Sequence, residues 1–73
     1  MSCYITHLIR ILDEMGVEVT RYNRRDIDLT IKRIVGTEGE GCPVTWKAVR
    51  EAMAGDKEGF LESLRNAARE QGW

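Results

Sequence analysis

The stretch that decides the fold is residues 43–73, PVTWKAVREAMAGDKEGFLESLRNAAREQGW. The large apolar residues of its first part recur at helical spacing: Trp46, Val49 and Met53. Gly55 and Asp56 then interrupt the pattern, because glycine weakens a helix and aspartate favours the position that caps the next one. We therefore expect two short amphipathic helices, about residues 45–54 and 56–71, with only Gly55 between them.

Signals for the ends of this helix pair are present at both sides. Pro43 disfavours an earlier start and Thr45 is a suitable cap. Gly72 is placed to end the second helix in the left-handed conformation, with Trp73 folding back onto Ala68. The sequence thus predicts both boundaries of the pair.

The amino-terminal part predicts a further helix over about residues 3–15, with Ser2 as its cap and Gly16 as its stop. Its apolar residues form one broad stripe: Tyr4, Ile5, Leu8, Ile11, Leu12 and Met15.

The middle of the chain has two interpretations. Asn23 is a good helix cap and Gly36 a good stop, which favours a helix over residues 24–35 after an extended Val17–Val19. Alternating apolar and polar residues over 17–32 are instead typical of a β-hairpin, which β-branched side chains also suit. The end signals favour the helix.

These elements predict a mainly α fold, a compact four-helix domain formed by residues 1–73 as one unit. The alternative is an α+β fold with the hairpin. The expected core combines the apolar stripes of all four helices: Ile5, Leu8, Leu12, Ile27, Ile31, Ile34, Trp46, Val49, Met53, Phe60, Leu61 and Leu64.

Composition limits the classes of function. The chain has 73 residues, 11 basic and 12 acidic, and a net charge of −1, so any contact with nucleic acid must come from a local patch. No apolar run approaches the roughly 18 residues that cross a bilayer. The amino terminus lacks the pattern of a secretory signal, so we expect a cytoplasmic protein that does not bind membranes.

The sequence predicts no metal site, no cofactor and no catalysis. Cys3 and His7 stand four apart, and a zinc site would need Cys42 as a third ligand, but no closely spaced cysteine pair exists. We expect two structural or incidental thiols and not a disulfide framework. Asp26 and Asp28 are two apart and do not face each other on a helix, so no acid pair is evident. We therefore expect neither an enzyme nor a small-molecule substrate.

The most basic segment precedes the second predicted helix. Three arginines and a tyrosine lie together there, and such residues bind phosphates and stack on bases: Arg21, Tyr22, Arg24 and Arg25. The alternative is a solvated helix start whose arginines pair with Glu18, Asp26 or Asp28.

Residues 27–73 resemble the core of the helix-turn-helix superfamily and, more loosely, of winged helices. An apolar helix leads to a short entry at 43–45, a second helix over 46–54, a turn containing glycine at 54–56, and a third helix over 57–71. The wing is not expected, because the sequence ends where it would begin.

The resemblance implies that the third helix enters the major groove of DNA. Arg65, Asn66 and Arg69 are then its expected contacts to the bases, while Glu58 and Glu62 oppose the approach of phosphates. The expected function is a small nucleic-acid-binding module, such as a transcription-associated regulator.

The alternative function is a non-enzymatic module for protein interaction or assembly, including a homodimer. It would use apolar surface left outside the core. The candidates for that surface are Tyr4, Leu29 and Trp73.

Overall fold

The structure is a computed structural model, and it describes residues 4–73. Those residues form three helices and no strand: α1 over Ile5–Glu14, α2 over Arg24–Val35 and α3 over Cys42–Gln71. The prediction of a mainly α fold is confirmed. The alternative hairpin over residues 17–32 is wrong, because α2 occupies the segment that its second strand would need.

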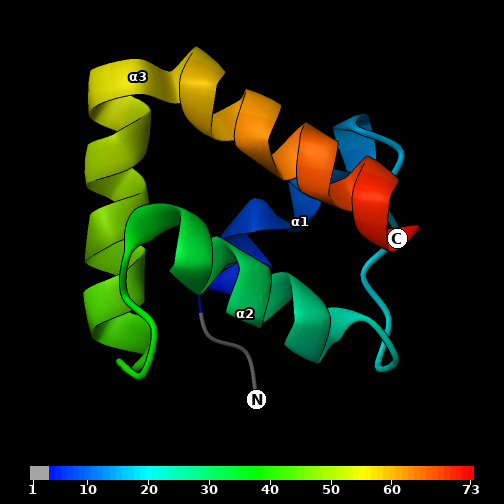
Figure 1. The fold of residues 1–73 in the computed structure, drawn as a ribbon, viewed down its shortest axis with the longest axis horizontal. Coiled ribbons are helices and arrows are strands. Elements are labelled where there is room, and N and C mark those ends of the chain that lie inside the picture. The colour runs from blue at the N-terminus through cyan, green and yellow to red at the C-terminus, as the bar shows by residue number, and fades with distance from the viewer. Residues whose placement is uncertain (1–3) are drawn as a thin grey trace.

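The bent helix α3 forms two sides of the molecule (Figure 1). Its first half runs along one side, and its second half crosses the top toward the carboxyl terminus. Helix α2 lies across the bottom, and α1 lies between α2 and the second half of α3. The helices therefore surround a central space that their apolar faces fill.

The bend in α3 lies at Asp56, whose φ of −149° and ψ of 75° are not helical. Its carboxylate Oδ1 accepts a hydrogen bond from the Gly59 N–H at 3.0 Å, the pattern of a helix cap. The predicted capping role of Asp56 is therefore confirmed. The predicted segments 45–54 and 56–71 both fall within α3, on either side of this residue.

Gly59 leaves room for the Asp56 carboxylate in the position that it occupies. A Cβ atom at Gly59 would lie 2.3 Å from Oδ2 of Asp56 and 2.8 Å from its Cγ, far inside contact distance. The absence of a side chain at Gly59 therefore allows the Asp56 carboxylate to lie over the helix end.

The start of α3 differs from the prediction. The helix begins at Cys42, so residues 43–45 are helical and do not form an extended entry. Pro43 fits there because the first turn of a helix needs no N–H donor. Thr45 is not the cap: it is fully buried, and its hydroxyl shares a 2.9 Å hydrogen bond with that of Thr37.

Cys42 is disulfide-bonded, so the prediction of a structural or incidental thiol is wrong at this position, because its sulfur is not a free thiol. Sequence separation alone does not reveal which thiols a fold brings within bonding reach. The other cysteine of the sequence, Cys3, lies outside the described residues.

Helix α1 begins at Ile5, and the predicted cap, Ser2, lies outside the described residues. Its carboxyl end is turned by Gly16, which has the predicted left-handed conformation, with φ of 83°. The Val17 N–H then donates to the Leu12 carbonyl at 2.8 Å, which directs Val17 into the core.

The other predicted glycine stops are also confirmed. Gly36 and Gly72 follow α2 and α3 with φ of 78° and 71°. The backbone N–H groups of Gly72 and Trp73 both donate to the Ala68 carbonyl, at 2.9 and 3.1 Å. Trp73 consequently folds back and packs against the edge of the core, as predicted.

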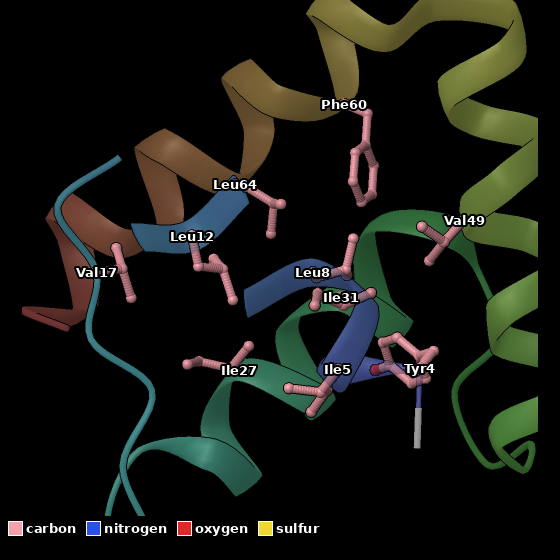
Figure 2. Packing of buried hydrophobic residues seen from close by; sticks show 10 residues of the cluster. All are labelled: Tyr4, Ile5, Leu8, Leu12, Val17, Ile27, Ile31, Val49, Phe60 and Leu64. Carbon is pink, nitrogen blue, oxygen red and sulfur yellow. The ribbon is translucent and has the colours of Figure 1, made fainter. Parts of the chain in front are cut away.

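The core is one cluster contributed by all three helices (Figure 2). Its buried apolar members are Tyr4, Ile5, Leu8, Leu12, Val17, Ile27, Ile31, Val49, Phe60 and Leu64. Four residues predicted to be in the core are only partly buried at its edge: Ile34, Trp46, Met53 and Leu61. The predicted apolar stripes therefore face the core, but these four of their residues lie at its edge.

Replacement of Leu64 by alanine tests this core. Leu64 has no exposed surface, so Leu64→Ala should cost about 2–5 kcal/mol and lower the melting temperature by roughly 8 °C or more. Leu29, which is 47% exposed, supplies the control, since Leu29→Ala should cost far less. A shift of only a degree or two for Leu64→Ala, measured by circular dichroism, would contradict the assigned core.

A double-mutant cycle tests the bend. Alanine normally stabilises a helix relative to glycine by about 0.5–1 kcal/mol. Gly59→Ala should bring little or no such gain in the native chain, because the new Cβ displaces the Asp56 carboxylate from its capping position and this offsets the gain in helix propensity. In an Asp56→Ala background the same change should become stabilising. Urea unfolding of the native chain, the two single variants and the double variant measures each change in stability. Equal effects of Gly59→Ala in both backgrounds would show that the cap and the glycine are independent.

Candidate functional site

The segment from Arg21 to Arg25, here called the basic turn, is held by a local hydrogen-bond network. The Thr20 hydroxyl accepts from the N–H groups of Tyr22 and Asn23, at 3.1 and 3.3 Å. Asn23 precedes α2 as predicted, but its side chain does not cap the helix. Its Oδ1 accepts from the Thr20 N–H and its Nδ2 donates to the Glu18 carbonyl, each at 2.8 Å. The turn is thus fixed before the helix begins.

This network projects an aromatic ring and two guanidinium groups into solvent. Tyr22 is 84% exposed, the most exposed of the large apolar side chains. The Arg21 guanidinium carbon lies 6.0 Å from the centre of the Tyr22 ring, at the limit of a cation–π contact. Arg21 and Arg25 are exposed, and Arg24 is half-buried. Singly exposed apolar side chains are common at protein surfaces, so the feature that distinguishes Tyr22 is the arginine beside its ring.

The basic turn keeps a local positive charge. Asp28, one of the expected partners of its arginines, instead pairs with Lys32 at 3.2 Å. Arg21 and Arg25 form no ion pair with the described residues. The amino end of α2 adds its partial positive charge, which Asp26 in the first turn partly offsets.

The predicted contacts on α3 lie in a different electrostatic setting. Arg65, Asn66 and Arg69 are exposed, but Arg65 Nη1 bonds Oε1 of Glu62 at 3.2 Å. The exposed charges of this half of α3 are balanced between cations and anions: Lys57, Arg65 and Arg69, against Glu58, Glu62 and Glu70. This face therefore attracts phosphate less strongly than the basic turn.

The predicted residues of the basic turn and those on α3 lie in segments that are held by different hydrogen bonds. Near the end of α3, Gln71 Nε2 donates to the Thr30 hydroxyl at 2.7 Å. Thr30 lies almost two helical turns along α2 from Arg24. The loop before α2 and the carboxyl end of α3 nevertheless lie along the same edge of the molecule (Figure 1).

A stacked group that the sequence does not predict joins α1 to α3. The His7 ring stacks on Trp46 with centroids 4.7 Å apart and planes at 14°. The Arg50 guanidinium lies 5.5 Å from the Trp46 ring. The spacing of Trp46 and Arg50 along one helix is a usable signal, whereas the contact with His7 depends on how α1 packs. Within residues 4–73 no group of three or more His, Cys, Asp or Glu is placed to hold a metal ion.

Tyr4 belongs to a structural network. Its hydroxyl donates to Oδ1 of Asp28, whose Oδ2 pairs with Lys32. Burial, and then the hydrogen bond and charge of Asp28, raise the pKa of Tyr4 well above its ordinary value. The prediction that Tyr4 is leftover apolar surface is wrong, because an acceptor on α2 allows the whole ring to be buried. Leu29 is exposed as predicted, and Trp73 is partly buried.

The second unpredicted feature is an open groove between the carboxyl end of α2 and the inside of the α3 bend. It encloses about 690 Å³. Its apolar part includes Ile34, Val35, Ala52 and Phe60, and the acidic residues that line it are Glu51 and Asp56. Small residues at the bend leave this space open: Ala48, Gly55, Gly59 and Ser63.

No protein-family model, curated protein or solved structure matches this chain. None of the helices in the described part of the chain has a stretch long and apolar enough to cross a membrane. Three features of the structure bear on function: the basic turn, the exposed Arg65, Asn66 and Arg69 on α3, and the groove.

The raised pKa of Tyr4 predicts a loss of stability in alkali. A folded-state pKa above the unfolded value of 10.0 means that the folded chain holds this proton more tightly. The protonated Tyr4 contributes fully to the free energy of unfolding below about pH 10, and this contribution is lost as the pH rises further. Urea unfolding should therefore show a steeper fall in stability between about pH 9 and pH 11 for the native chain than for Tyr4→Phe.

The exposed Tyr22 supplies the control for this measurement. Tyr22→Phe should leave the alkaline slope unchanged, because the Tyr22 side chain is 84% exposed and lies outside the Tyr4 network. If Tyr22→Phe flattened the slope as much as Tyr4→Phe, the Tyr4 network would not be its cause.

Proposed function

We propose that this chain is a small nucleic-acid-binding module in which the basic turn is the primary contact. The observation that carries the proposal is Tyr22, which is 84% exposed and has the Arg21 guanidinium 6.0 Å from the centre of its ring. Guanidinium groups bind phosphate oxygens in a bidentate manner, and an exposed ring offers a surface on which a base stacks. Such a turn suits unpaired nucleotides best, since their bases are free to stack.

The chemistry of each residue follows from its position. Arg21 and Arg25 contact phosphates, and the half-buried Arg24 is a weaker contact of the same segment. The amino end of α2 adds to the attraction for an anion. Tyr22 stacks on a base, which tolerates any sequence because every base has an aromatic face.

A helix-turn-helix-like arrangement is the second part of the proposal. In it α2, the first half of α3 and the second half of α3 act as three consecutive helices, and with α1 they make a four-helix domain. The bend at Asp56 supports this arrangement, because it changes the helix direction within a short turn that contains glycine. Arg65, Asn66 and Arg69 then supply a secondary contact nearer the bases. Regulation of transcription is the role that such a module would serve.

Fluorescence anisotropy with labelled oligonucleotides tests the primary contact. Single-stranded and duplex probes of mixed sequence are titrated at about 50 and 200 mM salt. Arg21→Glu/Arg25→Glu should weaken binding at least about tenfold, and the slope of log affinity against log salt should lose about 1.5 in magnitude. Tyr22→Ala should weaken single-strand binding about fivefold or more.

A double variant with the same change in net charge serves as the control. Arg33→Glu/Lys47→Glu alters exposed cations outside the basic turn and should have a much smaller effect. Equal weakening by both double variants would mean that only net charge matters. Affinity without salt dependence, or no binding at 50 mM salt, would refute the proposed function. Charge reversal of Arg65 and Arg69 measures the secondary contact separately.

A further inference from the structure

We propose that the groove at the α3 bend binds the basic turn of a second copy of this chain, so that copies associate head to tail. This inference is independent of nucleic-acid binding. It rests on the chemistry of two surfaces of the same molecule, which are opposite in charge and are both partly apolar.

The groove selects for a cationic, apolar occupant. Its apolar lining comes from both α2 and α3, and includes Phe60, which is almost fully buried and so forms a fixed wall. Among the described residues that line it, the only charged ones are Glu51 and Asp56, and both are anionic. The cap to Gly59 uses Oδ1 of Asp56, which leaves Oδ2 as an acceptor for a guanidinium group.

The basic turn supplies such an occupant. The Tyr22 ring is 84% exposed, the Arg21 guanidinium lies 6.0 Å from its centre, and Arg25 is exposed three residues later. A groove of about 690 Å³ has room for a tyrosine ring and part of its neighbours. In the complex the ring enters the groove, while the two guanidinium groups face Glu51 and Asp56.

The positions of the two surfaces decide the form of the assembly. The basic turn precedes α2, whereas Ile34 and Val35 of the groove end it. A helix of 12 residues separates them by roughly 18 Å, so a copy does not fill its own groove. The contact joins different patches on the two copies, and each added copy presents a new basic turn and a new groove.

The contact is small, so its affinity should be weak, with a dissociation constant of about 0.1–1 mM. Nucleic acid bound at the basic turn would compete with it. One basic turn therefore binds either a second copy or nucleic acid, but not both at once. Neither kind of binding requires the other.

Sedimentation equilibrium with two blocked variants tests the inference. Arg21→Glu/Arg25→Glu removes the cations of the turn, and Glu51→Lys/Ser63→Lys makes the groove cationic. All four positions are exposed, so both variants should fold. The average mass of the native chain should rise between about 20 μM and 2 mM, while each variant alone should remain a monomer.

The decisive sample is an equimolar mixture of the two variants. The turn-blocked chain keeps an intact groove and the groove-blocked chain keeps an intact turn, so the mixture should form a dimer and no larger species. A native chain that stays monomeric at 2 mM, a blocked variant that associates as the native chain does, or a mixture that stays monomeric would each overturn the inference.

A nucleic-acid titration separates this result from that of the proposed function. Glu51→Lys/Ser63→Lys should abolish self-association and bind the oligonucleotide at least as tightly as the native chain. Loss of oligonucleotide binding by this variant would show that the groove is not a separate surface and would overturn the inference.

Discussion

The bend in α3 at Asp56 is the constraint on which the rest of the fold depends, and the hydrogen bond from the Gly59 N–H to the Asp56 carboxylate caps the helix that follows it. As one straight helix, the 30 residues of α3 would be about 45 Å long. The longest dimension of the molecule is 27 Å. The bend therefore returns Phe60 and Leu64 toward the apolar faces of α1 and α2. It also creates the groove, since the two halves of α3 diverge from this point.

Much of the fold was predictable because its signals are local. Gly16, Gly36 and Gly72 end their helices as expected, and Asp56 caps as expected, because a left-handed backbone and a cap each depend on a few adjacent residues. The predictions that were wrong concern contacts between residues that are not adjacent in the sequence. Thr45 pairs with Thr37 across a loop instead of capping, a choice that depends on tertiary packing.

The same distinction applies to the candidate site. The basic turn is contiguous in sequence, so its residues were identifiable, and Thr20 and Asn23 hold it locally. The groove was not predictable, because its lining comes from the end of α2 and from both halves of α3. The burial of Tyr4 depends on Asp28, 24 residues away. An amphipathic pattern gives the inward face of a helix but not the partner that faces it.

The buried hydroxyl pair of Thr37 and Thr45 has a consequence for how this protein can evolve and be engineered. The pair ties the two ends of the loop over residues 38–41, whose residues are exposed. The anchors of the loop are thus set independently of what lies between them. Doubling the length of a flexible loop costs only about 0.6 kcal/mol, so an inserted peptide or domain near Gly39 would leave both helices in place. The loop is therefore a suitable position for sequence to be gained without loss of the fold.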